Sequence, residues 1–251
     1  MNRDPPDFLP WERSGGWLVP PGADMRNRGF FRVTTCFFPG LCYIKLATHR
    51  KIQKAQEDPT TMRPACFFDR DGVIIEETDY IHDPALVRLC PFAAEAVKAM
   101  RDAGRLVVVV SNQSGIARGY FTTDDLKAVD ARMKELLATE SAPVDGTYYC
   151  LHHKKGVVPE YTCDCDCRKP KPGLFFQAAK ELGIDLSESF MIGDKESDLE
   201  AGINAGCRGV ALVRTGHGVH QNIEAIPQAV DVHDVLSAAR ELLARYPYPA
   251  K

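Results

Sequence analysis

The chain has 251 residues, of which 45% are hydrophobic and 26% are charged, the proportions of an ordinary globular protein. This length allows one α/β domain with a sizeable core, or two small domains. A formal net charge of -3 gives no electrostatic reason to expect nucleic acid or an acidic membrane as a partner. The apolar stretch FFRVTTCFFPGLCYIKLA is too short and too interrupted to span a bilayer. We therefore expect a cytoplasmic protein with no membrane partner, and a monomer.

Residues 1–61 differ in composition from the rest of the chain. They hold seven of the 17 prolines and carry nine Lys and Arg against six Asp and Glu, which makes this segment +3 and the remainder -6. We expect either a poorly ordered extension or a segment upstream of a natural start at Met62, and we favour the second. The functional domain is then 62–251.

From residue 65 onward, apolar runs of strand length alternate with amphipathic helical segments. In chain order, we predict a strand at 65–68, a helix within 91–104, a strand at 106–110, a helix from about 123 to 137, a strand at 146–150, a helix at 174–182, a strand at 189–193, a helix through 199, a strand at 209–213 and a helix at 233–245. Phe92 is placed on the apolar face of the first helix, and Thr122 or Thr123 at the N-cap of the second. This alternation predicts an α/β fold with a doubly wound parallel sheet.

Three of the predicted strands run directly into polar residues. These are Asp69-Arg70-Asp71-Gly72, Ser111-Asn112-Gln113 and Asp194-Lys195, the last followed by Asp198. In an open parallel sheet, ligands bind outside the carboxyl ends of the strands, so we expect these groups to converge on one site.

Several carboxylates at one site repel one another unless a hard cation neutralises them, and Mg²⁺ is the usual choice. A phosphate could bridge that cation, with Ser111, Asn112 and Lys169 holding its other oxygens. One carboxylate would attack phosphorus, and a second would protonate the leaving alkoxide and later activate water. The residues thus predict a magnesium-dependent phosphatase of small molecules.

The order of these motifs resembles the haloacid dehalogenase superfamily of phosphatases. The likeness covers about residues 65–215 and rests on DRDG after a strand, Ser111 at the end of the next, a downstream Lys-Pro and GDKxxD after another strand. It implies a Rossmann-like fold with Asp69 as nucleophile and Asp71 as general acid/base. By the same likeness, the magnesium site includes Asp69, the Asp71 carbonyl, Asp194 and Lys195, and the phosphate is held by Ser111, Asn112, Gln113, Ser114, Arg168 and Lys169.

Four of the nine cysteines crowd into one segment, in CLHH (150–153) and CDCDC (163–167). Two close pairs of Cys and His separated by a loop are typical of a structural zinc site. Buried free thiols and a labile disulfide are the alternatives, although a CxC disulfide is strained. The spacing alone leaves more candidate ligands than the four positions of a tetrahedral zinc site.

Within the superfamily, CxHH…CDCRKPKPG together with NQSGIARG is similar to the heptose bisphosphate phosphatases, which carry a zinc loop and no large cap domain. This resemblance implies that zinc is bound by Cys150, His152, Cys165 and Cys167, with Cys163 as an alternative to Cys165. It also implies substrate contacts at Glu77, Thr78, Asp79 and Tyr80, and a substrate that is a small sugar phosphate. Histidinol-phosphate phosphatase is a rival within the enzyme class, and a non-enzymatic zinc-bearing binding module is a rival outside it.

Overall fold

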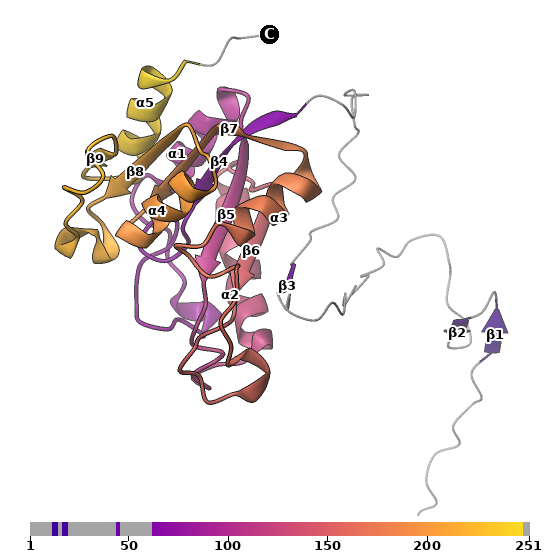
Figure 1. Ribbon diagram of the computed structural model, residues 1–251. Helices are drawn as coiled ribbons and strands as arrows, with labels where there is room; N and C mark the ends of the chain where they lie inside the picture. Colours follow the sequence, from indigo (N-terminus) through magenta and orange to yellow (C-terminus); the bar gives the residue numbers. More distant parts are fainter. Residues whose placement is uncertain (1–11, 15–16, 20–43, 46–61, 248–251) are drawn as a thin grey trace, which may run out of the picture. The chain divides into compact units, whose positions relative to one another are not determined.

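The computed structural model describes residues 12–14, 17–19, 44–45 and 62–247 (Figure 1). Residues 62–247 form a layered α/β structure around one sheet. In chain order its strands are β4 (Arg63–Phe68), β5 (Leu106–Asn112), β6 (Gly146–Cys150), β7 (Ile184–Gly193), β8 (Gly209–Val213) and β9 (Val230–Val232). These six strands pair in parallel in the order β6-β5-β4-β7-β8-β9. The predicted parallel sheet is therefore confirmed.

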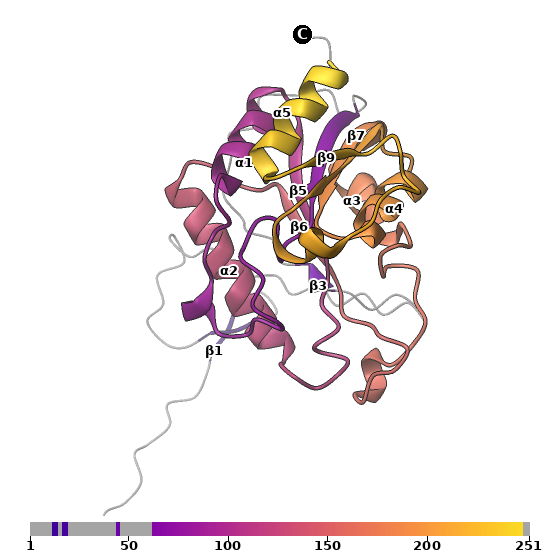
Figure 2. The ribbon, with the colours of Figure 1, turned by 90° about the vertical axis from the view of Figure 1, so that its left-hand side faces the viewer.

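Helices cover both faces of the sheet. They are α1 (Ala93–Asp102), α2 (Thr123–Thr139), α3 (Gly173–Leu182), α4 (Glu196–Asn204) and α5 (Val235–Arg245), with short 3-10 turns η1 (Pro84–Leu86), η2 (Pro159–Tyr161) and η3 (Gly216–His220). Seen along the sheet, α1, α2 and α5 lie on one side, and α3 and α4 lie on the other (Figure 2). This is the doubly wound arrangement expected from the alternation of strands and helices.

The central strands are apolar on both faces because each face of the sheet packs against a separate hydrophobic core. Successive side chains of a strand point to opposite faces of the sheet. In β5, Val107 and Val109 pack with the α1, α2 and α5 side, whereas Val108 and Val110 pack with the α3 and α4 side. The continuous valine run is thus the signature of a strand buried on both faces.

Two details differ from the sequence predictions. Phe92 is 52% exposed, because it adopts a left-handed conformation (φ 65°) as the N-cap residue of α1 and so lies outside the helical face. Strand β9 was not predicted, since its three residues are too few to show a period. The N-cap prediction for α2 is confirmed at Thr122, whose side chain forms a capping box with Asp125.

Little of the segment 1–61 belongs to the described residues. β1 (Glu12–Ser14) and β2 (Trp17–Val19) pair with each other in antiparallel fashion. β3 (Ile44–Lys45) pairs antiparallel with β6 at the edge of the main sheet. The rest of the segment lies outside the described residues, so the boundary at residue 62 stays a prediction. Among the helices described, none is both long and apolar enough to cross a bilayer.

Neighbouring phenylalanines of α3 provide a matched test of the core. Phe175 is fully buried, with its ring 4.6 Å from that of Phe67, whereas Phe176 is 51% exposed. We predict that Phe175→Ala lowers the free energy of unfolding by about 3–5 kcal/mol, because it removes a buried ring and leaves a cavity. Phe176→Ala should change it by less than about 0.5 kcal/mol. Urea unfolding measures both, and similar losses in the two variants would contradict the assigned helix face.

Candidate active site

The carboxyl ends of three central strands bring the predicted polar residues together. Asp69 follows β4, Ser111 lies near the end of β5, and Asp194 follows β7. All three side chains are buried, and one carboxylate oxygen each of Asp69, Asp194 and Asp198 lies within 4.8 Å of the others. Loops at the lower side of Figure 1 surround this edge of the sheet.

Lys169 is the cation at the centre of the carboxylate cluster. Its Nζ lies 2.9 Å from Asp69 Oδ1 and 2.7 Å from Asp198 Oδ1, and it donates to the Val110 carbonyl at 2.8 Å. The side chain is only 1% exposed, so its ion pairs replace nearly all of its hydration. A buried charge needs this degree of compensation to be tolerated.

The cluster still holds more negative charge than its cations neutralise. Burial, together with the Asp69 carboxylate, raises the pKa of Asp194 to about 7. Burial would raise the pKa of Asp69 as well, but Lys169 and Lys195 lower it. Asp69 is thus kept ionised, as a nucleophile requires, while Asp194 takes up a proton near neutral pH. A divalent cation bound by these carboxylates would replace that proton.

Asp71 lies two residues beyond Asp69 and is held from two directions. Arg70 Nε donates to Asp71 Oδ1 at 3.0 Å, and Gln113 Nε2 donates to Asp71 Oδ2 at 2.7 Å. Arg70 also donates to Gln113 Oε1 at 3.0 Å, which fixes the amide that orients Asp71. Unlike Asp69, Asp71 is partly exposed, so it can meet a substrate and exchange a proton.

Gly72 lets the chain pass close to Asp194. Its φ is +78°, and a Cβ at this position would lie 2.5 Å from Asp194 Oδ2. The same Oδ2 accepts from the backbone N–H of His217 at 2.8 Å, and Lys195 Nζ lies 3.1 Å from Asp194 Oδ1. Lys195 was expected at the magnesium site, but an ammonium has no lone pair, so its side chain can neutralise Asp194 and cannot act as a ligand.

The side chains of Ser111 and Asn112, both expected to hold phosphate, differ in their hydrogen-bond partners. Ser111 is buried, and its Oγ accepts from Gln113 Nε2 at 3.1 Å. Asn112 is engaged elsewhere: its side chain accepts from the Lys169 backbone N–H and donates to the Lys169 carbonyl, both at 3.1 Å. The Asn112 side chain therefore holds the backbone of Lys169 in place. The side chain of Ser114, two residues further along the chain, is partly buried.

The predicted substrate contacts lie on an exposed loop. Thr78, Asp79 and Tyr80 are exposed, and Tyr80 stacks edge-on against Tyr120 at 4.7 Å. Glu77 reaches toward the cluster instead, with its Oε2 3.8 Å from Lys195 Nζ and 3.2 Å from His217 Nε2. The loop is thereby tied to the site through Glu77.

The four predicted zinc ligands form a compact cluster of buried side chains, Cys150, His152, Cys165 and Cys167. Their sulfur–sulfur distances are 3.2, 3.3 and 3.6 Å, and His152 Nδ1 lies 3.3 Å from the Cys167 sulfur. Zn–S bonds of about 2.3 Å in a tetrahedron place sulfurs about 3.8 Å apart, so the cluster is close to the required size. Cys163 is exposed and outside it.

The chemistry of the cluster also fits a cation. Hydrogen bonds among the thiols lower the pKa of Cys165, while the bond with the Cys165 sulfur raises the pKa of Cys150 to about 12. Three thiolates this close to one another would repel without a cation. A bound Zn²⁺ would allow all of them to ionise, and three Cys with one His form a complete structural ligand set.

Two features of the site were not assigned a role from the sequence. Asp198 lies in GDKESD, but its spacing did not reveal that it faces Lys169 from the first turn of α4. Arg70 stands between Asp69 and Asp71 in sequence and is 1% exposed, and no local pattern distinguishes it from an exposed turn residue. Three-dimensional proximity alone assigns both.

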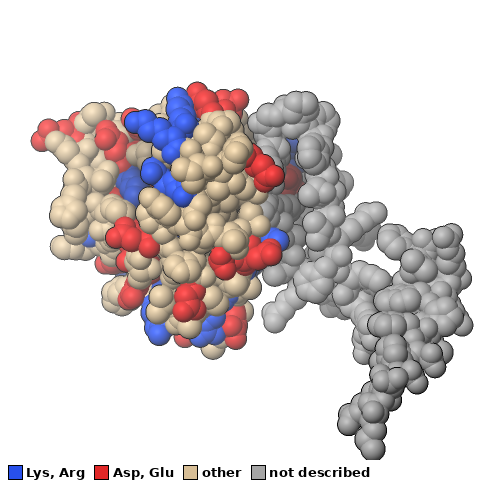
Figure 3. All heavy atoms as spheres, turned by 90° about the horizontal axis from the view of Figure 1, so that it is seen from below, with Lys and Arg blue, Asp and Glu red and all other residues tan. Residues whose placement is uncertain are grey.

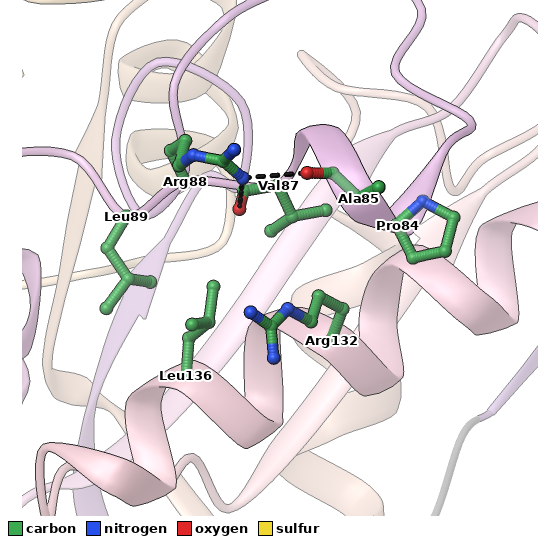
Figure 4. A pocket seen from close by; sticks show the side chains of 7 residues that line it. All are labelled: Pro84, Ala85, Val87, Arg88, Leu89, Arg132 and Leu136. Atoms are coloured by element: carbon green, nitrogen blue, oxygen red, sulfur yellow. Dashed lines mark hydrogen bonds between the residues drawn. The ribbon is translucent and has the colours of Figure 1, made fainter.

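Among the cavities of the described surface, two are lined by residues outside the carboxylate cluster. One, of about 720 Å³, lies between η1 and α2 and is lined by Pro84, Ala85, Val87, Arg88, Leu89, Arg132 and Leu136 (Figure 4). It contains none of the residues of the carboxylate cluster. The second, of about 410 Å³, is lined by Arg118, His153, Lys154, Lys155 and Arg168. On the face seen in Figure 3, basic and acidic side chains are interspersed.

The zinc assignment predicts different outcomes for two cysteines of the same loop. Cys167→Ser should lose zinc and several kcal/mol of stability, because the energy of binding a structural metal is part of the folding energy. Cys163→Ser is the matched control, since Cys163 is exposed, and it should keep about one zinc per chain. Elemental analysis and thermal unfolding measure both effects. Full zinc content in Cys167→Ser, or its loss in Cys163→Ser, would show that the ligand set is wrong.

Comparison with known proteins identifies the family. The model of HAD-hydrolase-like proteins matches residues 166–239. D-glycero-beta-D-manno-heptose-1,7-bisphosphate 7-phosphatase of Pasteurella multocida is 44% identical over 161 residues, which cover 64% of this chain and 87% of the relative. The enzyme of the same name from Haemophilus influenzae is 43% identical over 169 residues, covering 67% and 91%.

Solved structures agree with these relatives. A HAD-like phosphatase from Mesorhizobium loti matches with a TM-score of 0.68 and 38% identity, covering 82% of this chain and 92% of its own. D,D-heptose 1,7-bisphosphate phosphatase from B. bronchiseptica, complexed with magnesium and phosphate, matches with a TM-score of 0.64 and 31% identity, covering 72% and 99%. The predicted fold class and enzyme class are confirmed. The chain belongs to the D-glycero-beta-D-manno-heptose-1,7-bisphosphate 7-phosphatase family of HAD-superfamily phosphatases.

Proposed function

We propose that this enzyme removes the C7 phosphate of D-glycero-D-manno-heptose 1,7-bisphosphate through a phosphorylated aspartate. One observation carries the proposal: Asp69 is held ionised by Lys169 beside a carboxylate cluster, while Asp71, two residues away, is oriented by Arg70 and Gln113. The names of the relatives, which share this substrate, support the choice of sugar.

In this proposal, Asp69 and Asp71 perform different steps of the reaction. Asp69 attacks phosphorus and forms an acyl phosphate, while Asp71 gives a proton to the departing C7 alkoxide. Asp71 then takes a proton from water, which attacks phosphorus and returns Asp69 as a free carboxylate. Lys169, bonded to Asp69, is placed to stabilise the charge on the transferring group.

The carboxylate cluster fits Mg²⁺. Oxygen ligands are available from Asp69 and Asp194, and the raised pKa of Asp194 marks a position where positive charge is lacking. When bound there, magnesium would neutralise the carboxylates and the phosphate oxygens that approach them. Asp198 is directed to Lys169 and stabilises that cation from the other side.

Zinc has a structural role in this proposal. Cys167 is followed in sequence by Arg168 and Lys169, so fixing its sulfur restricts where both cations point. Arg168 Nη1 also donates to the His152 carbonyl at 3.2 Å, which ties it to a second ligand residue. A full set of protein ligands leaves no open position for water, so this metal takes no part in the reaction.

The remaining proposals concern the cellular compartment, the pathway, the oligomeric state and the domain boundary. The free thiols of the zinc cluster suit a reducing compartment, and we place the enzyme in the cytoplasm. We propose that it serves the synthesis of lipopolysaccharide or S-layer sugars, acts as a monomer, and carries its phosphatase within residues 62–251. The Asp-rich site and interspersed surface charges favour this enzyme over a nucleic-acid-binding module.

The nucleophile can be tested by isosteric substitution. We predict that Asp69→Asn lowers kcat on the order of 10⁴-fold or more, because an amide cannot form the acyl phosphate. Asp71→Asn should cost roughly 10²- to 10⁴-fold, the usual contribution of a general acid/base. Phosphate release measures both, and Asp124→Asn, an exposed change on α2, is the control. Wild-type turnover in Asp69→Asn would remove the nucleophile from the proposal.

The substrate can be tested against the rival phosphomonoester. We expect kcat/KM for heptose 1,7-bisphosphate to exceed that for histidinol phosphate by about 10²-fold or more, since the two differ in charge and polar groups. Steady-state phosphate release with both compounds, with Asp69→Asn protein as the blank, gives the ratio. A preference for histidinol phosphate would identify the rival activity as the correct one.

A further inference from the structure

A buried network of polar side chains joins helix α2 to strand β6 and has no role in the chemistry described so far. Asp130 on α2 is 2% exposed, and Tyr149 on β6 is fully buried. The Tyr149 hydroxyl donates to Asp130 Oδ1 at 2.5 Å. Lys134 Nζ, one turn further along α2, lies 2.6 Å from Asp130 Oδ2 and donates to Thr147 Oγ1 at 2.9 Å. Both oxygens of the buried carboxylate are thus satisfied, as burial requires.

The space around the Tyr149 ring is apolar. The ring packs in a hydrophobic cluster whose other buried members are Ile116, Phe121, Leu126 and Leu151. Replacing a buried ion pair by apolar side chains of similar volume is often neutral or stabilising, so such a pair is weak evidence for a role in stability. Packing alone therefore does not account for Tyr149 and Asp130.

The Tyr149 ring lies against the buried guanidinium of Arg70. Arg70 Cζ is 5.7 Å from the centroid of the ring, within the range of a cation–π contact. Arg70 is 1% exposed, and its Nη1 is buried with no hydrogen-bond partner among the described residues. The ring therefore replaces part of the hydration that this cation has lost. A phenol that donates to a carboxylate has a more electron-rich ring, so the bond to Asp130 strengthens the contact with Arg70.

Arg70 in turn fixes the carboxylate of Asp71. Its Nε donates to Asp71 Oδ1 at 3.0 Å and its Nη2 donates to Asp71 Oδ2 at 3.1 Å, a bidentate fork. The same Nη2 donates to Gln113 Oε1 at 3.0 Å, and Gln113 Nε2 donates to Asp71 Oδ2 at 2.7 Å. The three side chains close a ring of hydrogen bonds. A rotation of the guanidinium would therefore move Asp71 as well.

The contacts form one series from the α2 surface to the reaction site, through Lys134, Asp130, Tyr149, Arg70 and Asp71. Only the two ends reach solvent, with the Lys134 side chain 14% exposed and that of Asp71 16% exposed. The members between them are exposed by 2% or less. Polar groups in a surrounding of low dielectric polarise one another, so a change at Asp130 is transmitted to Arg70.

We infer that Tyr149 and Asp130 are positioning residues for the general acid, because they hold Arg70 and through it Asp71. The inference rests on the proposed function, since it takes Asp71 to be the group that protonates the leaving alkoxide. Proton transfer requires donor and acceptor within hydrogen-bond reach, so a freely rotating Asp71 would lose part of the roughly 10²- to 10⁴-fold contribution of acid catalysis. Tyr149 and Asp130 act through Arg70 and need no contact with substrate.

The leaving group provides a measurement that a merely structural role would not change. An alkoxide needs a proton as it departs, whereas p-nitrophenolate is stable enough to depart without one, so its ester bypasses the general acid. The parameter to compare is kcat/KM, which covers the steps up to phosphorylation of Asp69 and departure of the leaving group. The later attack of water, in which Asp71 acts as a base, does not enter it.

Tyr149→Phe is the principal variant, because it keeps the ring in the hydrophobic cluster and removes only the hydroxyl. The alkyl ester is heptose 1,7-bisphosphate or histidinol phosphate, whichever wild type hydrolyses better. We expect kcat/KM for this ester to fall by about 10-fold, and that for p-nitrophenyl phosphate by less than about 2-fold. Asp130→Asn should show the same selective loss, since the amide keeps the shape but not the charge. Thermal unfolding checks that both variants are folded.

Asp145→Asn is the matched control. Asp145 is another partly buried carboxylate that links a helix to the sheet, since its Oδ2 accepts from Arg101 Nη1 and from the Val107 N–H, both at 2.8 Å. Its contacts lie outside the series that ends at Asp71. We expect this variant to retain the wild-type ratio of kcat/KM for the two esters. A selective loss on the alkyl ester as large as that of Tyr149→Phe would overturn the assignment.

A double-mutant cycle tests whether the effect passes through Asp71. In Asp71→Asn protein the general acid is already absent, so adding Tyr149→Phe should lower kcat/KM for the alkyl ester by less than about 2-fold. A further 10-fold loss in the double variant would overturn the positioning role. Equal losses on the two esters in Tyr149→Phe alone, or no loss on either, would do the same.

The Asp71→Asn variant separates this inference from the proposed function. If Asp71→Asn lowers kcat/KM for the alkyl ester much more than for p-nitrophenyl phosphate but Tyr149→Phe does not, the general acid stands and the positioning role falls alone. If Asp71→Asn affects the two esters equally, the general acid of the proposed function is wrong, and the positioning role falls with it.

Discussion

The site depends on one buried ammonium, that of Lys169, placed between Asp69 and Asp198. Burial by itself would favour a neutral lysine and neutral aspartates. Their close contact reverses this, raising the pKa of Lys169 and lowering that of Asp69. The Asp69 carboxylate is therefore ionised because a cation from a distant part of the chain is buried with it. Every element that fixes the position of Lys169 contributes to that state.

Three structural features fix Lys169. The Asn112 side chain holds its backbone from β5, the Val110 carbonyl accepts from its ammonium, and the zinc cluster lies two residues upstream at Cys167. The segment between β6 and α3 thus supplies Lys169 to the site, although it contains no strand and only the short turn η2. A metal bound by the cluster of Cys150, His152, Cys165 and Cys167 would cross-link this segment.

The succession of strands and helices along the chain and the doubly wound sheet could be predicted because they depend on local patterns. The valine run of β5 indicates a strand buried on both faces, and Thr122 with Asp125 marks the start of α2. The positions of Asp69, Asp71 and Asp194 followed from strand ends and family motifs. Asp198 and Arg70 were expected near the site but were given no role, because their roles come from contacts with Lys169 and Gln113, which lie 29 and 43 residues away.

The sequence by itself determined the fold class, the enzyme family and the residues that gather at the carboxyl edge of the sheet, since hydrophobic period and motif order are properties of the chain. Only the tertiary structure decided which contacts each of those side chains makes. It bonded the Asn112 side chain to the backbone of Lys169 and directed the Asp198 carboxylate to the ammonium of the same lysine. Charge compensation and hydrogen bonding act through space, so they are fixed only when distant segments pack together.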